Sequence, residues 1–206
     1  NSLLPVNSLP TETLSRIFLE AAEGYPFRLP PKAVYCLDLT QVCRRWRDVA
    51  LGGPSLWSKL SFSCHPAFTD LMISRSGTAP LIIAIGESLG APNFNTLFLH
   101  YQRFRSVSVV CLPYSSEAFS SVHKIAPSTT LQRLSICGSH KQAHEVLPAL
   151  VQALSACPNL TYLDITRCHF SWNELPTPPS LQYLMLHNSN KRTPQMLSWM
   201  GIRTAL

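Results

Sequence analysis

The sequence predicts an α/β protein in which a helical N-terminal region precedes a parallel sheet. Residues 1–60 contain two apolar stripes at helical spacing. After them, short alternating apolar pairs recur every 21–29 residues, and their first members are Leu60, Ile83, Val107, Leu134, Leu163 and Leu184. Short strands separated by helical patterns are typical of a parallel sheet that helices cover on one side.

A first helix is predicted to begin near Pro10, because proline suits a first helical turn. One apolar stripe at i, i+3, i+4, i+7 spacing follows it, made of Leu14, Ile17, Phe18 and Ala21. Gly24 is expected to end this helix. Residues 25–36 contain three prolines and are therefore predicted to form a loop.

A second helix is predicted from about Leu37 to Leu51, followed by the stop Gly52-Gly53-Pro54. Its apolar face consists of Leu39, Val42, Cys43, Trp46 and Ala50. A short apolar segment then runs from Leu56 and Trp57 to Phe62. Two helices and a turn are too small to hide so many large apolar groups alone. The repeats or a partner must cover the remainder.

The two helical segments carry a known motif. Leu9-Pro10-Thr11-Glu12-Thr13-Leu14-Ser15-Arg16-Ile17-Phe18 is followed by Val42-Cys43-Arg44-Arg45-Trp46-Arg47 and then by Leu56-Trp57. This order resembles the F-box, although the gap between the helices is longer than usual. The resemblance implies a module that docks a substrate receptor onto the Skp adaptor of a cullin-type ubiquitin ligase and does no chemistry itself. The adaptor-binding residues that it implies are Leu9, Pro10, Leu14, Ile17, Phe18, Leu39, Val42, Cys43, Trp46, Leu56 and Trp57.

The second half of the chain repeats the pattern LxxLxL. It occurs at 131–136, 160–165 and 181–186, and 104–109 fits the same frame. The pattern resembles leucine-rich repeats and implies an irregular solenoid. Helical stripes are predicted between the strands, at 94–101 and 143–154.

An F-box followed by such repeats resembles fungal substrate receptors of Skp–cullin–F-box ligases. We therefore expect an F-box-like helical domain at 1–60 and a leucine-rich-repeat-like solenoid at 61–206. The chain does not begin with Met and is therefore expected to be a fragment, and the solenoid is expected to be incomplete.

The repeat register also predicts a surface for a protein substrate of unknown identity. In an LxxLxL strand the leucines face inward and the alternate residues face outward. The outward columns are Arg133/Tyr162/Tyr183, Ser135/Asp164/Met185 and Cys137/Thr166/His187. Because tyrosine and arginine are frequent binding hot spots, the predicted substrate-binding residues are Arg133, Tyr162, Asp164, Tyr183 and Met185.

Composition narrows the functional classes. Apolar residues make up 46% and charged residues 14%, which is typical of a globular chain. No apolar run approaches the roughly 18 residues of a membrane span. The seven cysteines form no CxxC pair, which favours free thiols and a cytoplasmic or nuclear protein. The net charge of +6 and the basic run around Trp46 leave a nucleic-acid-binding module as an alternative.

A serine hydrolase is the other alternative. Gly86-Glu87-Ser88-Leu89-Gly90 matches GxSxG after an apolar run, which is the context of a nucleophile elbow. Its partners are poor, because Asp164 is the only aspartate after Ser88. Cys137, His140 and His144 have metal-like spacing, but structural zinc needs four ligands. We therefore expect no enzyme activity, no metal and no cofactor.

Overall fold

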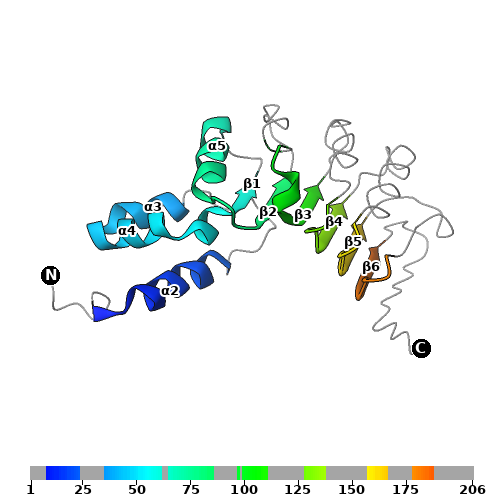
Figure 1. Ribbon diagram of the computed structural model, residues 1–206, viewed down its shortest axis with the longest axis horizontal. Coiled ribbons are helices and arrows are strands. Elements are labelled where there is room, and N and C mark those ends of the chain that lie inside the picture. The colour runs from blue at the N-terminus through cyan, green and yellow to red at the C-terminus, as the bar shows by residue number, and fades with distance from the viewer. Residues whose placement is uncertain are drawn as a thin grey trace.

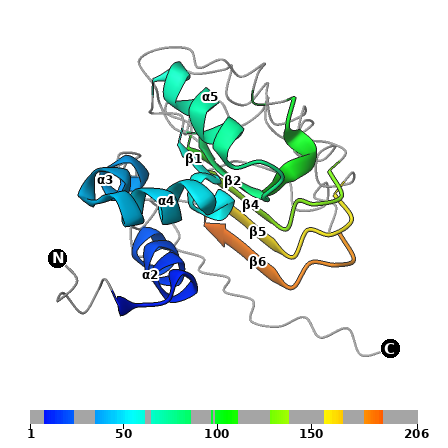
Figure 2. The same cartoon turned by 60° about the vertical axis from the view of Figure 1, so that its left-hand side comes forward.

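The computed structural model describes residues 8–23, 35–61, 65–85, 97, 99–110, 128–137, 157–166 and 178–187. Helices lie at the N-terminal end, and the strands follow one another away from them in sequence order (Figure 1). Turning the molecule shows α5 (Pro66–Arg75) still beside β1 (Lys59–Ser61), at the end of the sheet that adjoins the helices (Figure 2). The predicted division into a helical region and a parallel sheet is confirmed.

Helix α2 runs from Thr11 to Glu23, after Pro10, whose carbonyl accepts the backbone N–H of Leu14 at 3.0 Å. Leu14 and Phe18, two of the predicted adaptor-binding residues, are buried in the core. Ile17 is 45% exposed, whereas Leu19 and Ala22 pack against the core. The buried face thus keeps two members of the predicted stripe but shifts toward Leu19 and Ala22, on the side where α2 contacts α4 (Arg44–Gly52) and the segment after it.

The prediction of one continuous second helix is wrong, because the structure has two helices in this segment. Helix α3 runs from Tyr35 to Val42, and α4 runs from Arg44 to Gly52. Cys43 between them is extended, with φ −159° and ψ 170°. Its Sγ accepts the backbone N–H of Trp46 at 3.5 Å, which caps α4. The Nε–H of Arg47 donates to the carbonyl of Thr40 at 2.8 Å, which satisfies a group that the break leaves without a helical partner.

A short bridge joins the helices to the sheet. It consists of the 3₁₀ helix η1 (Pro54–Trp57) and strand β1 (Lys59–Ser61). Helix α5 (Pro66–Arg75) follows and was not predicted from the sequence. Its signals are a proline in the first turn, the His65 cap that accepts the N–H of Ala67 at 3.3 Å, and the buried pair Met72 and Ile73.

The described strands form a six-stranded parallel sheet in the order β1-β2-β3-β4-β5-β6. The strands after β1 are β2 (Leu81–Ile85), β3 (Phe104–Val110), β4 (Arg133–Cys137), β5 (Tyr162–Thr166) and β6 (Tyr183–His187). The predicted pairing is confirmed, since Leu60, Ile83, Val107, Leu134, Leu163 and Leu184 stand in register. Phe62 lies outside the described residues.

The predicted helical stripes between strands are tested only in part. Residues 143–154 lie outside the described residues, and so do most residues of 94–101. Leu97 is buried, and Tyr101 begins a short 3₁₀ helix, η2 (Tyr101–Arg103). The guanidinium of Arg103 ties η2 to the turn after α5, because it donates to the Ala79 carbonyl at 2.9 Å and to the Ser76 hydroxyl at 2.7 Å.

One cluster of buried side chains runs from the helices into the sheet. It includes Leu14, Leu39 and Trp57 as well as the inward residues of the strands. The predicted boundary between 60 and 61 falls inside β1, which pairs with β2. Within the described ranges, no helix is long and apolar enough to cross a bilayer.

Candidate interaction surfaces

The predicted adaptor-binding residues separate into an inner and an outer set. The inner set is buried and consists of Leu14, Phe18, Leu39, Leu56 and Trp57. A partner cannot touch side chains that the core already covers. These residues therefore shape the helical region from within, which leaves the outer set to make any contact.

The outer set reaches solvent. Ile17 is 45% exposed and Val42 is 59% exposed. Pro10 is also exposed, while Leu9, Cys43 and Trp46 are half-buried. The ring of Trp46 lies 4.9 Å from that of Phe18 at an interplanar angle of 56°, so one side of the indole rests on the core.

The basic run beside Trp46 is partly used within the fold. A guanidinium N–H of Arg45 donates to the carbonyl of Leu9, which links α4 to the residues just before α2. Arg47 donates across the α3–α4 break, as described above. Sequence reasoning missed both roles, because their carbonyl acceptors are identified only once the helices are packed. Two of the arginines that suggested nucleic-acid binding thus bind the chain's own backbone.

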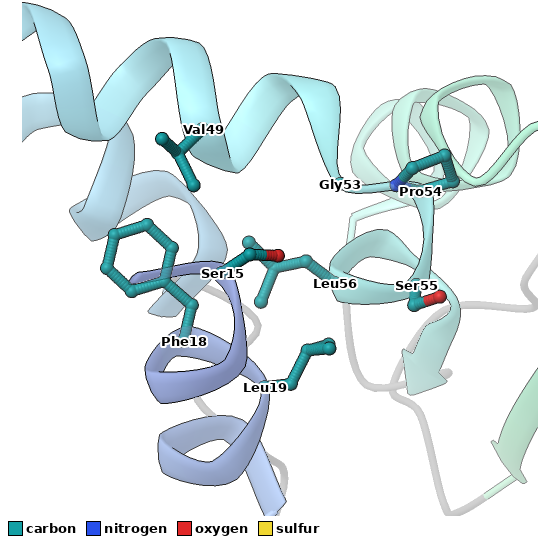
Figure 3. Close-up of a pocket in the computed structure, with 8 residues that line it drawn as sticks. All are labelled: Ser15, Phe18, Leu19, Val49, Gly53, Pro54, Ser55 and Leu56. Atoms are coloured by element: carbon teal, nitrogen blue, oxygen red, sulfur yellow. The ribbon is translucent and has the colours of Figure 1, made fainter. Parts of the chain in front are cut away.

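The helical region also contains a pocket of about 230 Å³ (Figure 3). Phe18 and Leu19 of α2, Val49 of α4 and Leu56 of η1 surround it, and the hydroxyls of Ser15 and Ser55 lie at its wall. Gly53 approaches α2 here, and a Cβ on it would lie 3.8 Å from Oγ of Ser15. The pocket therefore marks where α2 meets the start of the bridge to the sheet.

Trp57 anchors that bridge. Its indole N–H donates to the carbonyl of Ala50 at 2.7 Å, and the guanidinium of Arg75 lies 4.7 Å from its ring centroid. The thiol of Cys36 donates to the carbonyl of Leu56 at 3.1 Å. Burial raises the pKa of the Cys36 thiol to about 11, despite the smaller opposing effects of its backbone hydrogen bond and of Lys59. This thiol is therefore a structural group that stays protonated at neutral pH.

Residues 6–63 match the F-box-like family model. We call this segment the F-box-like domain. It takes in α2, α3, α4, η1 and β1, so its last element is also the first strand of the sheet. No curated protein matches the chain.

The predicted substrate-binding residues lie together on the outward face of β4, β5 and β6, beyond the F-box-like domain. Arg133 pairs in register with Tyr162, and Tyr162 pairs with Tyr183. The Arg133 guanidinium lies 4.4 Å from the Tyr162 ring centroid, and the two tyrosine rings are 6.4 Å apart. Arg133 is exposed, Tyr183 is 64% exposed, and Tyr162 is half-buried.

The neighbouring column holds Ser135, Asp164 and Met185. Asp164 accepts two hydrogen bonds, from the hydroxyl of Ser135 at 3.2 Å and from that of Thr166 at 3.0 Å. Met185 is 54% exposed. The predicted outward orientation of these residues is confirmed, and the structure adds that Asp164 is already bound by neighbouring hydroxyls.

The other predicted sites are only partly described. Ser88 and its glycines lie outside the described residues, as do His140 and His144. Both carboxylate oxygens of Asp164, the predicted acid of a hydrolase, accept hydroxyls of the sheet. In the described part of the chain, no group of three or more His, Cys, Asp or Glu side chains could hold a metal ion.

Proposed function

We propose that this chain is a non-enzymatic substrate receptor of a Skp–cullin–F-box ubiquitin ligase. In this proposal the F-box-like domain docks onto a Skp adaptor, and the sheet holds a protein for modification. The observation that carries it is the family match at residues 6–63, on helices that leave Ile17 and Val42 largely exposed. Large apolar groups on a surface are typical of sites that another protein covers.

Adaptor binding would rest on the outer set of side chains. Ile17 and Val42 would enter the interface as anchors, and the exposed side of Trp46 would extend it. The inner set would act indirectly, by holding α2 against α4. A few well-buried side chains usually supply most of the free energy of binding at a protein interface.

The sheet would serve as the receptor half. Its sequential order of parallel strands supports the leucine-rich-repeat solenoid that LxxLxL suggests, of the kind found in fungal F-box proteins. In a solenoid each strand adds one row of outward side chains, so substrate contacts would extend over several repeats. The buried free thiols Cys36 and Cys157 suit the cytosol or nucleus, where such ligases act.

Titration of the purified chain with a Skp adaptor tests the docking step. Ile17→Ser combined with Val42→Ser should weaken binding by about 2 kcal/mol or more, because two anchors would lose their apolar contact. Leu51→Ser is the matched control, since Leu51 is 40% exposed on α4 but lies outside the outer set. Melting curves check that all variants fold. Wild-type affinity in the double variant would sink the proposal.

A further inference from the structure

The outward face of β4–β6 combines one cation with two exposed or half-exposed tyrosines and a methionine. We call Arg133, Tyr162, Tyr183 and Met185 the receptor patch. Register sets them side by side, with Arg133, Tyr162 and Tyr183 on successive strands and Met185 two residues beyond Tyr183. Exposure of 64% for Tyr183 and 54% for Met185 leaves a large apolar area beside the cation.

Within the described residues, the charge of Arg133 has no carboxylate partner. The ion pair found there is between Arg16 and Glu20, at the other end of the molecule. Asp164 lies in the next column, but its carboxylate is bound by the Ser135 and Thr166 hydroxyls. These hydrogen bonds leave Asp164 its charge, so Arg133 and Asp164 together give this face no net charge. They hold the Asp164 carboxylate at the two hydroxyls, however, and the guanidinium of Arg133 is left to pair with a carboxylate on another molecule.

The geometry of Arg133 suits a carboxylate. Its guanidinium lies over the Tyr162 ring, which occupies a flat face and leaves N–H groups at the edge available. Stacking also restricts the side chain, so less conformational freedom is lost when a ligand binds. A carboxylate can then accept two parallel N–H bonds from the guanidinium.

We propose that the receptor patch binds an acidic peptide segment, in which an Asp or Glu side chain pairs with Arg133 while a nearby apolar side chain covers Tyr183 and Met185. Strands lie about 4.8 Å apart, so the step from β4 to β6 is about 10 Å, or about three residues of extended peptide. The acidic and apolar residues should therefore stand about three positions apart. That the peptide belongs to a ligase substrate rests on the proposed function; the binding itself does not.

Selection from a random peptide library displayed on phage, with the full chain as bait, tests this inference. Enriched peptides should contain Asp or Glu about three residues from an aromatic or aliphatic residue. A selected peptide, labelled with fluorescein, should then bind Arg133→Gln and Tyr183→Ser about tenfold more weakly than the wild type, because each loses a main contact. Arg133→Lys should also bind more weakly, since lysine keeps the charge but lacks the planar fork.

Arg16→Gln is the matched control, because it removes the same charge from an exposed site on α2. Its peptide affinity should equal that of the wild type. Enrichment of peptides without acidic residues, no enrichment over bare resin, or unchanged affinity in Arg133→Gln would each overturn the inference. Self-association of the wild type that Tyr183→Ser abolishes would also overturn it, because a second copy would then cover the patch.

The same variants separate this inference from the proposed function. Adaptor titration of Arg133→Gln should match the wild type, and the Ile17→Ser/Val42→Ser variant should still bind the selected peptide. If the wild type binds the selected peptide but does not bind the adaptor, only the ligase role is refuted. The reverse result would refute only the peptide site.

Discussion

Ile17 and Phe18 are neighbours on α2 and differ sharply in exposure, at 45% and 2%. Both belong to the motif that predicts adaptor binding, yet one faces solvent and the other contacts Trp46. The cysteines show a similar division, since Cys36 and Cys157 are buried whereas Cys43 and Cys137 are half-buried. At the residue scale, one residue type thus serves as core or as surface according to its place on the element.

Cysteine alkylation checks this division. Between pH 7 and 9, iodoacetamide should modify Cys43 and Cys137 much faster than Cys36 and Cys157, because burial blocks access and raises the pKa of both buried thiols. Peptide mass spectrometry gives the rate at each site. Equal rates at all four cysteines in the folded chain would show that Cys36 and Cys157 are not buried.

The same shift has a defined sign for stability. The folded state holds the Cys36 proton up to a pKa of about 11, whereas the ordinary value is 9.0. The contribution of this thiol to the free energy of unfolding is therefore complete below about pH 9 and declines as pH rises toward 11. Cys36→Ala should remove that part of the alkaline loss of stability in denaturant titrations.

At the scale of elements, the break at Cys43 has consequences for α3 and α4. In an uninterrupted helix, the residues of α3 and α4 would share one axis, so their buried faces could not be oriented independently. The extended residue instead lets each helix pack separately, and α4 contacts both α2 and α3. The cap on Trp46 N–H and the Arg47 bond to Thr40 satisfy backbone groups that the break leaves open.

Substitutions at Cys43 check the cap. Cys43→Ser should be more stable than Cys43→Ala by about 1 kcal/mol, because serine offers a better acceptor to the helix N-terminus. Urea denaturation measures the difference. Cys137, half-buried on β4 with no helix to cap, provides the control pair, in which serine should gain no such advantage over alanine. Equal stability of the two Cys43 variants would argue for a continuous helix.

At the scale of the whole molecule, the F-box-like domain and the sheet share a core. Trp57 contacts α4, because its indole N–H donates to the Ala50 carbonyl, and it contacts α5, because the Arg75 guanidinium lies over its ring. Strand β1 begins two residues later. Leu60 in β1 pairs with Ile83 in β2. Substitutions that destabilise the first strands should therefore also lower the local stability of the helices. Substitutions in the last strands should lower it less.

Hydrogen exchange tests this coupling. Ile83→Ala and Leu163→Ala remove similar volumes from fully buried sites and should each cost about 2–5 kcal/mol of local stability. Amide exchange in α2 and α4 should rise more in Ile83→Ala, because Ile83 adjoins the shared core. An equal rise in both variants would mean that the chain unfolds as one unit, and no rise in either would mean that the helices are independent.

The strands and their register could be predicted from the sequence, because alternation along a strand is local and only one register buries every apolar pair. The approximate extent of α2 and the F-box resemblance followed in the same way from spacing and motif. Helix α5 was missed although its proline and apolar spacing were visible in the sequence. A proline and a few apolar residues within ten positions also occur in loops, so they do not by themselves predict a helix.

The surfaces that could bind partners were decided by tertiary structure. Spacing placed Leu14, Ile17 and Phe18 on one stripe, but the position of α4 and η1 determined which of them stayed exposed. Arg45 and Arg47 donate hydrogen bonds to backbone carbonyls. Asp164 accepts hydrogen bonds from two hydroxyls, and the guanidinium of Arg133 lies over a tyrosine ring. Periodicity depends on near neighbours in the chain, whereas exposure and free charge depend on which distant elements pack against each residue.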